Sequence, residues 1–118
     1  MDLQDRVALV TGAAGSLGKV VAAAYAAAGA RLVLVDVAEP FLKSAYPGDD
    51  PRRLLLTADL MDAASTAKAI DAAVAKFGRI DAVANIAGGF DMGPAVHETS
   101  AELWKKMLDL NAGTVLNV

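Results

Sequence analysis

The stretch Thr11-Gly12-Ala13-Ala14-Gly15-Ser16-Leu17-Gly18 decides the fold of this chain. It joins the apolar run 6–10, which predicts a buried parallel strand, to the alanine-rich segment 16–28, which predicts a helix that Gly29 ends. Glycines at this point permit a tight turn and let a pyrophosphate approach the N–H groups at the positive end of the helix. The stretch therefore predicts a dinucleotide-binding turn, with a glycine-rich turn that holds no ligand as the alternative.

The rest of the chain alternates strands and helices. Apolar runs at residues 31–35, 54–58 and 80–85 predict three more strands, and segment 38–51, with three prolines, predicts an irregular crossover containing at most one helical turn. Alternating strands and helices are typical of a parallel sheet. Right-handed crossovers predict an α/β fold, a Rossmann-type doubly wound sheet that is incomplete, with strand order 3-2-1-4 and helices on both faces.

Two later helices carry recognisable boundary signals. Asp62 is expected to cap a helix that Gly78 ends, with an apolar stripe formed by Ala63, Ala67, Ile70, Val74 and Phe77. The segment 99–102, Thr-Ser-Ala-Glu, fits a capping box that opens a last helix. Asn111 lies in that helix, and because asparagine is a mediocre helix former, we expect it to disturb the helix locally.

Composition and charge exclude several classes of protein. The 118 residues carry a net charge of −3, with 11 basic against 14 acidic residues, so no basic surplus is present to bind a nucleic acid. The absence of cysteine excludes a disulfide framework and thiolate metal sites, and a single histidine excludes a His-rich metal site, so no metal is expected. The charged N-terminus does not resemble a signal peptide, and no stretch is long enough to span a membrane. We therefore expect a soluble cytoplasmic protein.

Asp36 is the second candidate residue for dinucleotide binding. It ends the strand at 31–35 and lies eighteen residues after Gly18, where a carboxylate accepts hydrogen bonds from the adenosine ribose hydroxyls. The alternative is an aspartate that only shapes a turn. None of its neighbours Val37, Ala38, Gly15 and Ser16 is basic, so nothing near it in the sequence matches a 2′-phosphate. The sequence therefore predicts NAD in preference to NADP.

Taken in order, these segments resemble the N-terminal half of a short-chain dehydrogenase/reductase. Asp59-Leu60 resembles the pair that contacts adenine in this family, the segment 85–88 resembles its Asn-x-Ala-Gly motif, and Asn111 resembles the asparagine of its catalytic tetrad. The resemblance implies that Asn111 is catalytic. It also implies that the cofactor is bound by Gly12, Gly15, Ser16, Leu17, Gly18, Asp36, Asp59, Leu60, Asn85, Ala87 and Gly88.

The same resemblance implies the activity. Residues 1–118 would form the NAD-binding half of an oxidoreductase that transfers a hydride between nicotinamide and a carbonyl or alcohol substrate. The family's Ser, Tyr and Lys would lie in a half that this chain lacks, so we expect the chain alone to be inactive and the full-length protein to be a homo-oligomer, a dimer or tetramer.

Two alternatives stay open. The single-domain branch of the family carries Gly or Ala where this chain has Ser16, and glycines at 12, 15 and 18 match the spacing of the extended branch, which includes NAD-using epimerases and dehydratases. The other alternative is a non-catalytic dinucleotide-binding module.

Overall fold

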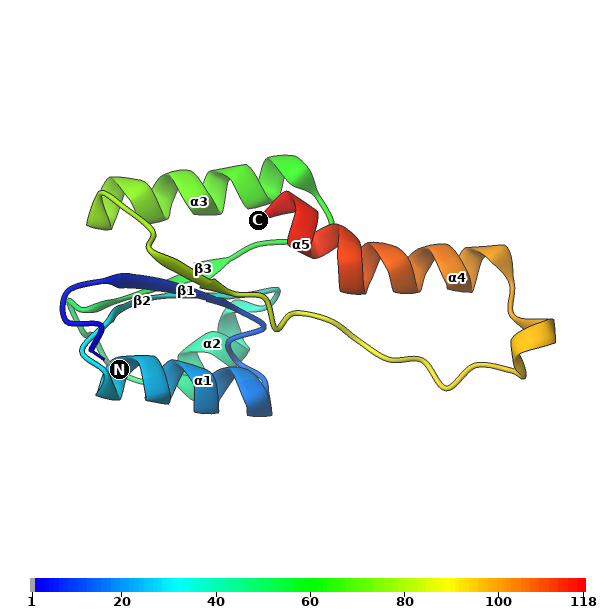
Figure 1. The fold of residues 1–118 in the computed structure, drawn as a ribbon, viewed down its shortest axis with the longest axis horizontal. Helices are drawn as coiled ribbons and strands as arrows, with labels where there is room; N and C mark the ends of the chain where they lie inside the picture. Colours follow the sequence, from blue (N-terminus) through cyan, green and yellow to red (C-terminus); the bar gives the residue numbers. More distant parts are fainter. Residues whose placement is uncertain (1) are drawn as a thin grey trace.

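A computed structural model, which describes residues 2–118, contains a parallel sheet between two layers of helices (Figure 1). The sheet has the order β3-β2-β1-β4, in which the strands are β1 (Val7–Thr11), β2 (Arg31–Asp36), β3 (Arg53–Thr57) and β4 (Ala82–Ala84). Helices α1 (Ser16–Ala27) and α2 (Glu39–Ala45) cover one face, and α3 (Ala63–Phe77) and α5 (Thr114–Asn117) cover the other. This arrangement confirms the predicted strand order and the helices on both faces.

The segment after β4 projects from the sheet. It contains the 3₁₀ turn η1 (Val96–Glu98), the helix α4 (Ala101–Leu108) and the π-helical turn η2 (Asp109–Gly113), which continues into α5. In Figure 1 this arm extends to the right of the sheet and makes the molecule elongated, with extents of 49 × 28 × 26 Å. No helix within residues 2–118 is long and apolar enough to cross a membrane.

The core lies on both faces of β1 and β2. Val7 and Leu9 of β1 belong to the cluster that packs against α3, whereas Ala8 and Val10 belong to the cluster on the α1 face. Successive side chains of a strand point to opposite faces, so one continuously apolar strand serves both layers. All four side chains are fully buried.

The crossover between β2 and β3 differs from the prediction. The segment predicted to be irregular contains the seven-residue helix α2, with Pro40 in its first turn and Leu42 buried beneath it. Proline is favoured in the first turn of a helix because its missing N–H has no partner there and its φ angle is already helical. A proline that suggested a break therefore marks the beginning of a helix.

β4 is shorter than the predicted strand at 80–85. It pairs with β1 through three residue pairs, from Ala8 with Ala82 to Val10 with Ala84. It lies at one edge of the sheet within the described residues, and Val83 is 43% exposed. The polar residues Asp81 and Asn85 flank β4 directly, so the predicted strand, which included both of them and Ile80, was too long.

Helix α3 begins and ends where the sequence predicts. The carboxylate of Asp62 accepts hydrogen bonds from the N–H groups of Ala64 and Ser65, at 3.3 and 3.2 Å. Gly78 ends the helix with a φ of 78°, in the left-handed region that glycine adopts without strain.

The predicted apolar stripe of α3 is only partly right. Ile70 and Phe77 pack against the core, but Ala63, Ala67 and Val74 are exposed. The face that meets the sheet consists of small residues, namely Thr66, Ala69 and Ala73. Small side chains let the helix approach the strands closely, so size decides the buried face here more than hydropathy does.

Helix α4 begins one residue later than the capping box predicts. Ser100 is its N-cap and accepts a hydrogen bond from the N–H of Leu103 at 3.1 Å. Thr99 instead donates its hydroxyl to the carbonyl of Ala95 at 3.4 Å. Segment 99–102 therefore opens a helix as predicted, but the cap is Ser100, which has the same capping chemistry as Thr99 and lies one position further along.

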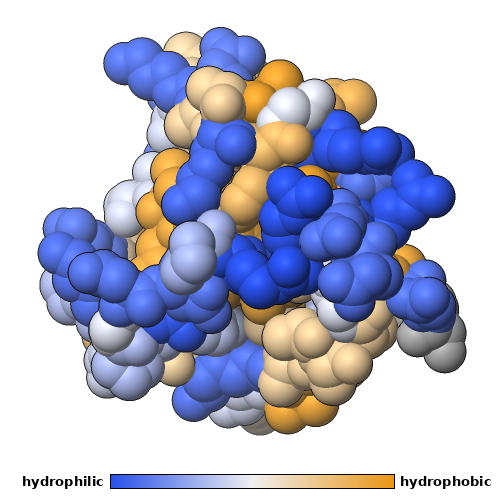
Figure 2. Space-filling view, turned by 90° about the vertical axis from the view of Figure 1, so that its left-hand side faces the viewer, coloured by the Kyte–Doolittle hydropathy of each residue, from blue (hydrophilic) through white to orange (hydrophobic). Residues whose placement is uncertain are grey.

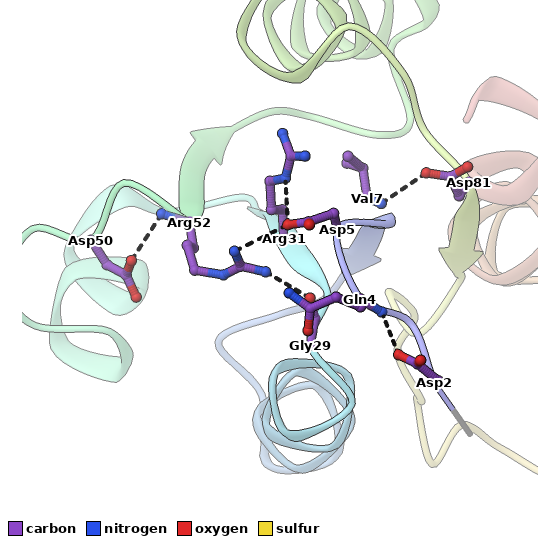
Figure 3. A network of polar contacts seen from close by, with 9 residues as sticks. All are labelled: Asp2, Gln4, Asp5, Val7, Gly29, Arg31, Asp50, Arg52 and Asp81. Atoms are coloured by element: carbon purple, nitrogen blue, oxygen red, sulfur yellow. Dashed lines mark hydrogen bonds and ion pairs between the residues drawn. The ribbon is translucent and has the colours of Figure 1, made fainter.

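Charged side chains gather at the amino ends of the strands, the end of the molecule that faces the viewer in Figure 2. Arg31 and Arg52 both approach the carboxylate of Asp5, at 3.8 and 3.3 Å, as Figure 3 shows. The carboxylate of Asp81 accepts a hydrogen bond from the N–H of Val7, and with Arg79 this bond holds the pKa of Asp81 below its ordinary value. These polar groups satisfy one another and fasten the chain ahead of β1 to its neighbours.

Candidate functional site

The glycine-rich turn between β1 and α1 is built so tightly that two of its residues must be glycine. Gly12 has a φ of 62°, and a Cβ atom there would lie 2.9 Å from the backbone nitrogen of Ala87. A Cβ atom on Gly18 would lie 2.1 Å from the carbonyl oxygen of Gly12. Helix α1 therefore begins directly above the turn, and the segment that follows β4 lies against it.

The first turn of α1 has backbone donors that no side chain caps. Its N-cap is Gly15, which has no side-chain hydrogen bond, and the first turn contains no acidic residue. The first N–H of the helix to bond back along the chain is that of Lys19, to the carbonyl of Gly15 at 3.0 Å. The N–H groups of Ser16, Leu17 and Gly18 precede it and lie at the positive end of the helix dipole, which suits an anion.

A cleft of about 480 Å³ opens at the carboxyl ends of the strands, over this turn. It brings together all of the predicted cofactor-binding residues except Asn85, and Asn111 also lies outside its lining. Its walls are formed by Gly12, Gly15, Ser16, Leu17, Gly18, Asp36, Val37, Ala58, Asp59, Leu60, Met61, Ile86, Ala87, Gly88, Leu110 and Thr114. Parallel α/β sheets bind their ligands at this edge, where the strand order reverses.

Asp36 is fixed on the wall of the cleft. One carboxylate oxygen accepts a hydrogen bond from the N–H of Ala14 at 2.9 Å, and the other accepts one from the N–H of Val37 at 2.8 Å. Each oxygen keeps a further lone pair for another donor. The carboxylate is thus oriented before any ligand binds.

Lys19 lies closer to Asp36 in the fold than the sequence suggests. A second hollow, of about 430 Å³, is lined by both residues together with Val37 and Ser44. The expectation that no basic group is placed near Asp36 considered only sequence neighbours. The helical turn between Gly15 and Lys19 brings this cation to the same hollow, so a basic residue does border the space beside Asp36.

Asp59 and Leu60 occupy the wall of the cleft opposite α1. Leu60 is buried, and its carbonyl accepts a hydrogen bond from the side chain of Asn117 at 2.8 Å. The carboxylate of Asp59 accepts a hydrogen bond from the N–H of Met61 at 3.0 Å, and Asp59 itself is exposed. Asp59 therefore shapes its own turn and also borders the cleft.

Thr11 organises the far side of the cleft, a role that the sequence analysis missed. Its buried hydroxyl accepts hydrogen bonds from the N–H groups of Ile86 and Ala87, at 3.0 and 3.1 Å. These contacts hold the segment after β4 against the end of β1. The partners are about 75 positions away in the sequence, so no local pattern indicates the contact.

Asn111 joins the projecting arm to the segment after β4. Its side-chain oxygen accepts a hydrogen bond from the N–H of Gly89 at 3.0 Å, and its side-chain nitrogen donates to the carbonyls of Gly89 and Met107, at 2.9 and 3.0 Å. Asn111 lies inside the π-helical turn η2, which confirms the predicted local disturbance of the helix. A Cβ atom on Gly88 would lie 2.6 Å from its side-chain oxygen, so the two segments approach closely.

Comparisons with known proteins agree on one family. A family model described as short chain dehydrogenase matches residues 6–118. D-threitol dehydrogenase from Mycolicibacterium smegmatis is 42% identical over 118 residues, which cover 97% of this chain and 45% of that protein. The chain thus spans about half the length of this curated relative.

Solved structures show the same likeness. A short-chain dehydrogenase/reductase of the glucose/ribitol dehydrogenase type from Brucella melitensis superimposes with a TM-score of 0.89 at 29% identity, over 99% of this chain and 51% of that one. A 3-ketoacyl-(acyl-carrier-protein) reductase from the same organism, complexed with NADH, superimposes with a TM-score of 0.86 at 28% identity, over 98% and 48%.

Proposed function

This chain belongs to the short-chain dehydrogenase/reductase family, and on that premise we propose that residues 1–118 are the NAD-binding half of an oxidoreductase. The whole protein would transfer a hydride between nicotinamide and a small carbonyl or alcohol substrate. NAD would be preferred over NADP, and the family's Ser, Tyr and Lys would be supplied from outside this chain. The full-length enzyme would be a cytoplasmic homo-oligomer.

The fixed carboxylate of Asp36 carries the proposal. It lines the same cleft as the uncapped first turn of α1, so a donor set for a pyrophosphate and an acceptor for ribose hydroxyls share one wall. Two backbone N–H groups hold the carboxylate in place. A relative of known structure carries NADH, which supports a nicotinamide cofactor for this cleft.

The residues present fit that cofactor. The N–H groups of residues 16–18 would bind the pyrophosphate, Asp36 would accept from the ribose, and the apolar Leu60 would line the adenine side with Asp59 at its rim. Ala87 and Gly88 would border the nicotinamide half. The bound cofactor would supply or accept the hydride.

Asn111 completes the proposed set as its catalytic member. Its side chain holds the backbone of Gly89, and the π-helical turn around it changes the carbonyl pattern of the helix. In this proposal, Asn111 positions that turn so that a carbonyl is free to hold a water for proton transfer. Asn85 stays a proposed cofactor contact at the end of β4, outside the described cleft lining.

The test is cofactor preference in the intact protein that contains this chain. A 2′-phosphate about 4 Å from the Asp36 carboxylate would meet a repulsion on the order of 1 to 4 kcal/mol, so kcat/KM should favour NAD by about tenfold or more. The double substitution Asp36→Ala with Val37→Arg should narrow or invert that preference. Lys19→Ala is the matched control for the neighbouring positive charge. It should lower kcat/KM for NADP more than kcat/KM for NAD.

Equal kcat/KM values for the two cofactors would contradict the NAD preference. Cofactor binding without any turnover over a panel of alcohols and carbonyl compounds would favour the non-catalytic module.

A further inference from the structure

The peptide unit between Ala13 and Ala14 is held on both of its polar atoms. Its N–H, from Ala14, donates to Asp36 at 2.9 Å, and its carbonyl, from Ala13, accepts from the hydroxyl of Tyr46 at 2.7 Å. Ala13 is fully buried, so an unpaired carbonyl there would be costly. One peptide in the glycine-rich turn thus connects Tyr46 with the carboxylate that faces the cleft.

We propose that Tyr46 is a positioning residue for cofactor recognition, acting on Asp36 through the Ala13–Ala14 peptide. This inference rests on the proposed function, because it presumes that Asp36 distinguishes NAD from NADP. Tyr46 itself does not line the main cleft, and it would contact no part of a cofactor bound there. Its hydroxyl prevents the peptide from rotating, and the peptide keeps one Asp36 oxygen directed toward the turn.

Tyr46 is rigid enough for this role. It is the C-cap of α2, and its N–H bonds to the carbonyl of Leu42 at 2.9 Å. The guanidinium carbon of Arg53 lies 5.9 Å from the centre of its ring, and Arg53 also donates to the carbonyl of Tyr46 at 3.0 Å. Arg53, the first residue of β3, therefore holds Tyr46 at both its ring and its backbone, and this fixes the position of the hydroxyl.

Burial keeps the hydroxyl of Tyr46 protonated by raising its pKa above the ordinary value. Arg53 opposes this effect on the pKa, and the nearby charge of Asp36 adds to it. The hydroxyl is thus a donor throughout the neutral range. A hydrogen bond to the Ala13 carbonyl also polarises the peptide, which strengthens its N–H as a donor to Asp36.

The experiment compares the affinities of NADH and NADPH in the intact protein, measured by fluorescence titration in the absence of substrate. Tyr46→Phe keeps the ring and removes only the hydroxyl. It should reduce the ratio of NADH to NADPH affinity about fivefold, the factor expected for one ordinary hydrogen bond. Tyr25→Phe is the matched control, since the Tyr25 hydroxyl makes no hydrogen bond within residues 2–118.

The same substitution in an Asp36→Ala protein distinguishes a positioning role of Tyr46 from a general loosening of the glycine-rich turn. If Tyr46 acts through Asp36, then Tyr46→Phe should leave the affinity ratio unchanged in an Asp36→Ala protein. A turn that is merely loosened would weaken both cofactors by the same factor and leave the ratio unchanged in the parent, which would overturn the inference.

Different results would overturn the role of Asp36 in cofactor preference and the role of Tyr46 in positioning it. A parent that prefers NADH and loses the preference on Asp36→Ala, but not on Tyr46→Phe, overturns the role of Tyr46 alone. A parent without a preference for NADH overturns the assignment of Asp36 and this inference with it.

Discussion

Helices α1 and α3 pack on opposite faces of the same sheet, yet they begin in opposite ways. Helix α3 begins at Asp62, whose carboxylate accepts two of its first N–H groups. Helix α1 begins at Gly15, which has no side chain to offer, and Gly18 in its first turn lets it lie directly on the turn below. The difference separates a helix whose first N–H groups are capped by a side chain from one whose first N–H groups no side chain caps.

The largest effect should come from closing the space under α1. Gly18→Ala places a Cβ atom 2.1 Å from the carbonyl of Gly12, so the helix and turn must separate. Hydrogen bonds to a charged group contribute about 1.5–3 kcal/mol each, so displacing the first N–H groups of α1 should lower the NADH affinity of the intact protein by about 100-fold. Fluorescence titration measures the loss.

Gly113→Ala is the control for this change, because its added Cβ atom would meet nothing closer than 3.9 Å. It should keep NADH affinity near that of the parent. An unchanged affinity in Gly18→Ala would show that the close approach of α1 to the turn is not needed for binding.

A smaller effect should follow when α1 is given the kind of cap that α3 has. Gly15 has a φ of −73° and a ψ of 168°, an extended conformation that any residue adopts, and a Cβ atom there would lie 3.3 Å from the carbonyl oxygen of Gly12, which would have to shift slightly. In Gly15→Asp, a carboxylate occupies the first N–H groups of α1 and repels a phosphate, so NADH affinity should fall about tenfold. The melting temperature without cofactor should change little, because the new cap offsets the close contact with the carbonyl of Gly12.

Gly15→Asn separates the effect of capping α1 from the effect of repelling a phosphate, because asparagine caps the helix without adding a negative charge. We expect its loss of affinity to lie between those of the parent and Gly15→Asp. A fall in melting temperature in both variants, with affinity unchanged, would contradict the view that the open N-terminus serves a ligand.

The smallest effect should come from removing the cap of α3. Asp62→Ala leaves the N–H groups of Ala64 and Ser65 without their acceptor and should lower the free energy of unfolding by about 1 kcal/mol. NADH affinity should not change, since Asp62 is not part of the cleft lining. Denaturant titration measures the loss, and Asp62→Asn should retain most of the stability.

Local signals explain what the sequence could predict. The apolar strands, the cap at Asp62, the end of α3 at Gly78 and the disturbance at Asn111 each depend on residues within a few positions of one another. The cleft could be predicted too, because the glycine-rich turn and Asp36 lie at the ends of neighbouring strands. The sequence predicted one helical turn at most where α2 has seven residues, because proline both breaks a helix from inside and is favoured in its first turn, where Pro40 lies.

Contacts between distant segments could not be predicted. Thr11 meets residues some 75 positions away, and Tyr46 reaches a carbonyl 33 positions before it. Lys19 borders the hollow beside Asp36 because the first turn of α1 and the end of β2 meet there. In each case a side chain of ordinary type gains its role from the topology, and the sequence near it carries no trace of that role.

The π-helical turn at Asp109–Gly113 also decides what a change in length would do to the chain. A π turn holds one more residue than an α turn, so deleting Ala112 would let an unbroken α-helix form. Because the wider turn absorbs the extra residue, this deletion would leave the direction of the following residues nearly unchanged, with Thr114 buried and Asn117 on the carbonyl of Leu60. A deletion in a regular α-helix would instead rotate all that follows by about 100°. Loss of one residue here should therefore spare the packing of α5 and remove only the widened turn around Asn111.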